Sequence, residues 1–257
     1  MQDIAVSQRI ARPRAVLFDL FHTLVCVPSP AMWNEPSVGE ILGVSESQWR
    51  QLFYDEDRFG RGIGRVRDGV EAMRLVTHAI DPTVSEGRIL AAVESRRRRF
   101  ESALTQVEAG VLQALDRLHT AGIRTAVVSD VGADDVECWD DSPIATRIDA
   151  VAFSCDLGVC KPSARIYEHA LQALDVTPVD AIFVGDGGSN EHRGASDLGM
   201  STALVTRLLA TWWPEKIQGR RGQTNCRAPD MPGPDRRNDS RLSVGRRPII
   251  AGRDSLL

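Results

Sequence analysis

The sequence lacks a long apolar run and a recognisable leader segment, and both absences narrow the classes of protein to which it can belong. No apolar stretch approaches the roughly 20 residues that are needed to span a bilayer. The N-terminal stretch MQDIAVSQRIARPR has no apolar core of signal-peptide length. We therefore expect a soluble, unprocessed, cytoplasmic protein without a membrane partner.

The chain also has few cysteines and no excess of positive charge. Its five cysteines are odd in number and form no CxxC pair, so neither a disulfide framework nor a zinc site is indicated. The formal net charge of −4 gives no global field for nucleic acid, and we expect no nucleic-acid partner. A small anionic substrate must then be bound by local groups, and nothing in the sequence indicates the oligomeric state.

Short apolar runs that end at polar residues recur along the 257 residues, and amphipathic segments lie between them. Strands that alternate with helices predict an α/β fold with a doubly wound parallel sheet. Five buried strands are expected at Ala15–Phe18, Thr125–Val128, Val151–Phe153, Ala181–Val184 and Thr202–Val205.

The interval between the first and second expected strands has a different pattern. It is rich in amphipathic helical segments, at Val38–Leu42, Trp49–Tyr54, Val66–Ile80 and Ile89–Leu104. We interpret 25–108 as a helical cap inserted into an α/β core domain that comprises 1–24 and 109–214. Within the last of these helices, the basic run Arg96–Arg99 is interpreted as a solvated face without a functional role.

The end of the chain has yet another composition. Residues 216–257 hold ten Lys and Arg against four Asp, a local net charge of 10 − 4 = +6, with many Gly and Pro. Such a stretch cannot bury enough apolar surface to offset its ordering entropy. We interpret 215–257 as a basic, disordered tail, and its lack of aromatic residues disfavours base stacking.

Ligands of open α/β sheets bind beyond the carboxyl ends of the strands, so the polar residues just after each apolar run are the candidate site. They offer a carboxylate nucleophile, two hydroxyls, one cation and two further carboxylates. This set can attack a substrate, hold an anionic group and bind a hard metal ion through oxygen. The six residues are Asp19, Thr23, Ser129, Lys161, Asp186 and Glu191.

Four stretches resemble the ordered motifs of the haloacid dehalogenase-like (HAD) hydrolases. AVLFDLFHTLV resembles the first motif at Asp19 and Thr23, and TAVVSD resembles the second at Ser129. GVCKPSARIY resembles the third at Lys161, and GDGGSNEHRGA resembles the fourth at Asp186 and Glu191. The resemblance covers about residues 14–206 and places the family's helical C1-type cap in the long interval after the first motif.

The resemblance implies a phosphatase of a small phosphorylated metabolite with Asp19 as the nucleophile. Thr23, Ser129 and Lys161 would then bind the phosphoryl group, and Mg²⁺ would be the cofactor. The implied metal ligands are Asp19, the backbone carbonyl of Phe21, Asp186 and Glu191.

Phe21 departs from the family's first motif, which has a second aspartate at this position. In the family's phosphatases that aspartate protonates the leaving group and activates water, so either His22 or a cap residue replaces it or the enzyme is slow. The resemblance also allows a 2-haloacid dehalogenase, which carries an aromatic residue at this position and needs no metal. A catalytically impaired binding protein on the same fold is the third alternative.

Overall fold

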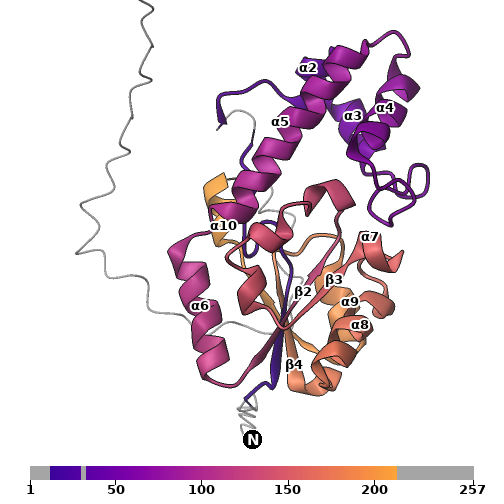
Figure 1. The fold of residues 1–257 in the computed structure, drawn as a ribbon. Coiled ribbons are helices and arrows are strands. Elements are labelled where there is room, and N and C mark those ends of the chain that lie inside the picture. Colours follow the sequence, from indigo (N-terminus) through magenta and orange to yellow (C-terminus); the bar gives the residue numbers. More distant parts are fainter. Residues whose placement is uncertain (1–11, 30–32, 213–257) are drawn as a thin grey trace, which may run out of the picture. The chain divides into compact units, whose positions relative to one another are not determined.

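The computed structural model describes residues 12–29 and 33–212, and within them the five expected strands form one parallel sheet (Figure 1). The strand order is β3-β2-β1-β4-β5, which confirms the predicted doubly wound fold. The strands are β1 (Ala15–Phe18), β2 (Arg124–Ser129), β3 (Ala150–Phe153), β4 (Ala181–Gly185) and β5 (Ser201–Leu204).

Helices cover both faces of the sheet, which explains why its strands are continuously apolar. On one face, α8 (Ala164–Leu174) and α9 (Glu191–Asp197) contribute Tyr167 and Ala195 to a core with Leu17. On the other face, α6 (Ala109–Thr120) contributes Leu115 to a core with Val127. Shorter helices complete this part of the chain: α7 (Ser154–Leu157), α10 (Arg207–Trp212) and the 3-10 turns Ala133–Asp135, Trp139–Asp141, Ala145–Arg147 and Pro178–Asp180.

Several helices of the described residues lie between β1 and α6, and we call residues 33–108 the helical insertion. They are α2 (Val38–Leu42), α3 (Glu46–Phe53), α4 (Gly69–Ile80) and α5 (Glu86–Thr105). Ser37 and Asp68 accept hydrogen bonds from backbone N–H groups at the starts of α2 and α4, as helix N-caps do. The insertion has an apolar core of its own, with Trp49 and Phe53 stacked at 4.6 Å between ring centroids.

The boundaries of the expected domains, at 24/25 and 108/109, stay a prediction. The predicted tail at 215–257 lies outside the described residues. No helix within the described ranges is long and apolar enough to cross a membrane.

The strand order places the reversal of the sheet between β1 and β4, where ligand sites of this architecture form. β1 pairs with β2 on one side and with β4 on the other, and Phe18 lies opposite both Val127 and Val184. The residues that follow β1, β2 and β4 therefore meet at one edge of the sheet.

Candidate active site

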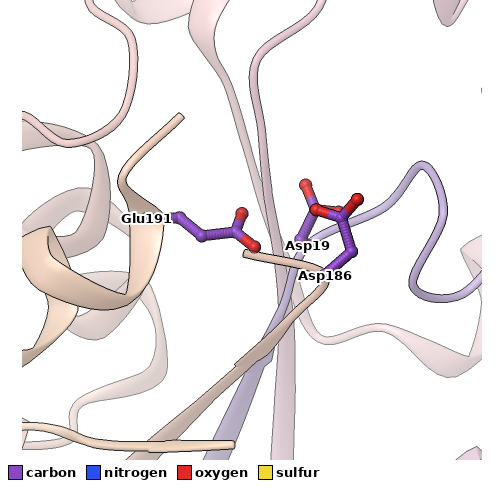
Figure 2. A group of neighbouring side chains, drawn as sticks. All are labelled: Asp19, Asp186 and Glu191. Carbon is purple, nitrogen blue, oxygen red and sulfur yellow. The ribbon is translucent and has the colours of Figure 1, made fainter. Parts of the chain in front are cut away.

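Asp19 and Asp186 follow adjacent strands and lie side by side (Figure 2). The backbone N–H of Asp19 donates to the carbonyl of Val184 at 2.9 Å, which extends the β1–β4 ladder by one residue. Both aspartates are buried, so their carboxylates are held at the strand ends with little access to bulk water.

Lys161 joins the nucleophile candidate to the last carboxylate of the predicted site. Its Nζ donates to Asp19 Oδ1 and to Glu191 Oε2, both at 2.6 Å. Burial alone would lower the pKa of Lys161, but the charges of Asp19, Glu191 and Asp130 outweigh burial and hold that pKa well above its ordinary value. Lys161 is therefore a permanent cation in the site.

The two predicted hydroxyl residues also lie at this edge. Thr23 Oγ1 donates to Asp19 Oδ2 at 3.0 Å, so both carboxylate oxygens of Asp19 accept a hydrogen bond. Ser129 is the buried last residue of β2, the strand beside β1. Its neighbour Asp130 accepts a hydrogen bond from the backbone N–H of Lys161 at 2.8 Å, which orients the segment that carries the lysine.

The loop after β4 wraps around the side chain of Glu191. The N–H of Gly187 donates to Glu191 Oε1 at 2.7 Å, and the N–H of Gly188 donates to Asp186 Oδ1 at 2.9 Å. A Cβ at Gly185 would lie 2.2 Å from Glu191 Oε1, so a side chain at that position would displace the Glu191 carboxylate. Tyr167 supports the loop from behind, because its hydroxyl donates to the backbone carbonyl of Glu191 at 2.8 Å.

Three carboxylates of the site form a cluster that suits a hard divalent cation. One oxygen each of Asp19, Asp186 and Glu191 lies within 4.8 Å of the other two, and all three residues are buried. Lys161 offsets only one of the three negative charges. Burial, reinforced by Asp19 and Asp186 and opposed by Lys161, raises the pKa of Glu191. Oxygen ligands and excess negative charge are the features that Mg²⁺ binding requires.

Phe21 extends away from this cluster toward the helical insertion. Its ring meets that of Phe100 edge to face, with 5.1 Å between centroids. Phe21 and His22 both line a cavity of about 170 Å³ whose other walls come largely from the insertion. Backbone φ at His22 is 71°, and its Nδ1 lies 3.2 Å from Cys26 Sγ. Phe21 has no titratable group, so it cannot supply a proton to a leaving group.

One interpretation of the sequence was wrong, because the basic run of α5 is not a uniformly solvated face. Arg97 and Arg98 are exposed, whereas Arg96 and Arg99 are buried. Residues 96 and 99 are three apart and so share one helical face, which packs against the rest of the molecule. Arg96 is held there by an ion pair with Asp135 and by its stacking over Phe100 at 4.2 Å.

Asp134 and Asp135 were missed by the sequence analysis, although they tie the insertion to the strand ends. Arg61 of the insertion contacts Asp134 at 2.6 Å and Asp135 at 2.8 Å, and Arg96 also pairs with Asp135. Burial alone would raise the pKa of Asp135, but the two arginines outweigh it and lower that pKa. No local pattern could reveal this pairing, since its partners are separated by tens of residues.

Comparisons with known proteins agree with this geometry. The family profile described as haloacid dehalogenase-like hydrolase matches residues 13–196. (S)-2-haloacid dehalogenase 4A of Burkholderia cepacia is 29% identical over 205 residues, covering 76% of this chain and 83% of that protein. Glyceraldehyde 3-phosphate phosphatase of Methanopyrus kandleri is 27% identical over 205 residues, covering 76% of this chain and 84% of that protein.

Solved structures show the same fold. L-2-haloacid dehalogenase from Xanthobacter autotrophicus, with chloropropionic acid covalently bound, matches with a TM-score of 0.54 and 23% identity, covering 80% of this chain and 83% of that chain. Relatives named for dehalogenation and relatives named for phosphate hydrolysis both match. The comparisons therefore identify a HAD-fold hydrolase and do not choose between the two reactions.

Proposed function

This chain belongs to the haloacid dehalogenase-like hydrolases, and we propose that it is a Mg²⁺-dependent phosphatase of a small phosphorylated metabolite that acts through a covalent intermediate on Asp19. The observation that carries the proposal is the buried cluster of Asp19, Asp186 and Glu191, in which three carboxylates face one lysine. A cation at this position would relieve their mutual repulsion. By the family resemblance, the dehalogenases do not keep the aspartate that Asp186 matches.

The protein residues of the site suit nucleophilic attack on phosphorus. In the first step, an oxygen of Asp19 forms a bond to phosphorus, and the bond between phosphorus and the substrate oxygen breaks. In the second step, water attacks the phosphorus of the aspartyl phosphate, which releases inorganic phosphate and restores the Asp19 carboxylate. Bound by Asp19, Asp186 and Glu191, Mg²⁺ would supply positive charge beside the phosphoryl oxygens.

Lys161, Thr23 and Ser129 have distinct parts in this scheme. Lys161 and Thr23 each contact one oxygen of Asp19, so together they fix the orientation of the nucleophile. Lys161 also offsets the repulsion between that carboxylate and an anionic phosphoryl group. With substrate bound, the hydroxyl of Ser129 would donate to a phosphoryl oxygen, and so would that of Thr23 once its single proton turns from Asp19 to the substrate. The proton for the departing alkoxide comes from water or from His22, because the side chain of Phe21 has no titratable group.

A 2-haloacid dehalogenase is the second candidate, and Phe21 favours it. Halide leaves without protonation, so an aromatic residue at this position costs that reaction nothing. The ring of Phe21 and the nearby ring of Phe100 make one end of the cavity apolar, as a carbon–halogen group would require. In this reaction Asp19 attacks carbon, halide leaves with the bonding electrons, and water hydrolyses the resulting ester.

Metal dependence separates the two candidates. We expect Mg²⁺ to be required for turnover in a panel of phosphorylated metabolites and 2-haloacids, and Asp186→Asn to reduce phosphatase turnover by about 10² to 10³, since a charged ligand and its contribution to charge stabilisation are lost. Asp197→Asn, at an exposed residue of α9, is the matched control. Halide release that needs no metal and is unaffected by Asp186→Asn would establish the dehalogenase instead. Absence of both activities would favour the third alternative, a catalytically impaired binding protein on the same fold.

A further inference from the structure

The cavity beside Phe21 is lined by charged residues of the helical insertion that the catalytic scheme does not use. Two of these charged residues are Arg96 and Arg99 of α5. The aromatic residues Trp49 and Phe100 also line the cavity. The lining also includes Asp130, which follows Ser129 and binds the backbone of Lys161. The cavity thus connects the strand ends with the buried face of α5.

Arg99 differs from the two other buried arginines of the insertion because its charge is not matched. Arg61 and Arg96 share Asp134 and Asp135, so two cations face two carboxylates. Arg99 is only 7% exposed, yet it forms no ion pair or hydrogen bond with any residue in the ranges 12–29 and 33–212. Burial, reinforced by Arg96, lowers the pKa of Arg99 from its ordinary value.

The other charged groups around the cavity are already engaged. Glu46 accepts a hydrogen bond from the N–H of Gly39 at 2.7 Å and pairs with Arg50 at 3.8 Å. Glu35, which also acts on the Arg99 charge at longer range, pairs with Arg98 at 3.1 Å. Neither carboxylate therefore neutralises Arg99.

The unpartnered polar atoms of this region are all donors. In the described part of the chain, the buried side-chain nitrogens without a hydrogen-bond partner include Trp49 Nε1, Arg96 Nε and Arg99 Nε, and all three residues line this cavity. A buried donor without an acceptor carries a desolvation penalty, which an anionic acceptor in the cavity would remove. A neutral or cationic ligand would leave the Arg99 charge uncompensated.

We propose that Arg99 binds a carboxylate of the substrate, so that this enzyme acts on small phosphorylated carboxylic acids. The inference rests on the proposed phosphatase function and adds a second anionic group to its substrate. One uncompensated guanidinium matches the single charge of a carboxylate, whereas a second phosphate would bring about two charges. A planar guanidinium also forms paired hydrogen bonds with a carboxylate, and a volume of about 170 Å³ admits only a short carbon chain.

A matched pair of substrates tests the proposal. 3-Phosphoglycerate and glycerol 3-phosphate share the phosphoryl group and differ in a carboxylate against a hydroxymethyl group. We expect wild-type kcat/KM to favour 3-phosphoglycerate by about 10- to 100-fold, the effect of one buried hydrogen bond to a charged group. Arg99→Met should bring the ratio close to one, mainly by raising KM for 3-phosphoglycerate, and Arg99→Lys should give an intermediate ratio.

Arg97→Met provides the control, because Arg97 belongs to the same basic run but is exposed and pairs with Glu94 and Glu101. This variant should keep the wild-type ratio. A ratio that survives Arg99→Met, or falls equally with Arg97→Met, would overturn the proposal. If Arg99→Met does not fold, a KM for 3-phosphoglycerate that is identical in Arg99→Lys and wild type overturns it as well.

A readout without turnover separates failure of this inference from failure of the proposed function. Malonate carries carboxylates and no phosphate, and it should raise the Tm of the wild-type protein but not that of Arg99→Met. If neither phosphorylated compound is hydrolysed, the phosphatase proposal fails, while a malonate shift that depends on Arg99 still supports the carboxylate site. A shift that is the same in both proteins, or absent in both, overturns the carboxylate site.

Discussion

The strand ends and the helical insertion both bury charged side chains, but the excess charge is negative at the strand ends and positive in the insertion. At the strand ends, Asp19, Asp186 and Glu191 face the single cation Lys161. In the insertion, Arg61 and Arg96 face Asp134 and Asp135, whereas the buried Arg99 has no paired carboxylate among the described residues, which leaves one positive charge unmatched. Burying an unpaired charge is costly, so each excess marks a place where a ligand of the other sign would stabilise the protein.

The two proposals together assign different parts of one substrate to these two regions. The cluster at the strand ends is suited to a cation and to the chemistry that a cation assists. The cavity by Arg99 is suited to an anion that does not react. Phe21 belongs to both regions, since it follows Asp19 by two residues and lines the cavity.

Among the changes that test this comparison, removal of the nucleophile at the strand ends is expected to have the largest effect. Asp19→Asn should reduce turnover by a factor on the order of 10⁴ or more, because an amide of nearly the same shape is a poor nucleophile. Steady-state turnover and circular dichroism measure activity and fold, and Asp116→Asn, at an exposed residue, is the control. Full activity in Asp19→Asn would exclude the covalent mechanism.

Breaking the ion pairs between the insertion and the strand ends should have the next largest effect. Asp135→Asn leaves Arg61 and Arg96 buried with only the partly exposed Asp134, and it should lower the free energy of unfolding by about 3–5 kcal/mol. Urea denaturation at neutral pH measures this change. A loss below about 1 kcal/mol would show that these buried pairs add little to stability.

A carboxylate introduced at Phe21 tests whether the chemistry at the strand ends is limited by a missing general acid. Phe21→Asp should raise phosphatase turnover on substrates with poor leaving groups by about tenfold, below the range of an optimised general acid, and should change turnover of an activated aryl phosphate much less. Parallel assays of both substrates provide the test. If both activities fall together in a folded variant, a missing acid is not the limitation, and a site shaped around the aromatic ring is favoured.

The smallest expected effect concerns the unmatched charge itself. Without ligand, Arg99→Met should raise the free energy of unfolding by about 1 kcal/mol, because an uncompensated buried cation is replaced by an apolar side chain of similar length. Chemical denaturation of the two proteins side by side measures the difference. A clear loss of stability would mean that the Arg99 charge is satisfied in the free protein.

Much of the fold could be predicted from periodicity, and the errors lie at the ends of the elements. β1 has the predicted bounds, since the apolar run stops where the strand stops, at Phe18. α5 begins at Glu86, before the predicted Ile89, because its polar first turn after Ser85 contributes nothing to an apolar pattern. Local patterns therefore locate the buried part of an element better than its capped ends.

The candidate site was predictable for a related reason. Asp19, Ser129 and Asp186 come at or just after strand ends, and parallel strands bring those ends to one edge of the sheet. The roles of these residues remain proposals. The positive excess was not predictable, because the spacing of Arg96 and Arg99 shows only that they share a helical face. The carboxylates that face Arg96 lie far along the chain in a short 3-10 turn.

The shared use of Asp135 by two arginines has a consequence for the additivity of mutations. Arg61→Met alone leaves Asp135 paired with Arg96, and Arg96→Met alone leaves it paired with Arg61. Either single change therefore removes one cation without isolating the carboxylate. The double variant leaves a buried carboxylate with no cation among these partners, so its cost should exceed the sum of the two single costs. Asp135 thus gives the molecule a form of redundancy, in which either arginine is dispensable only while the other is present.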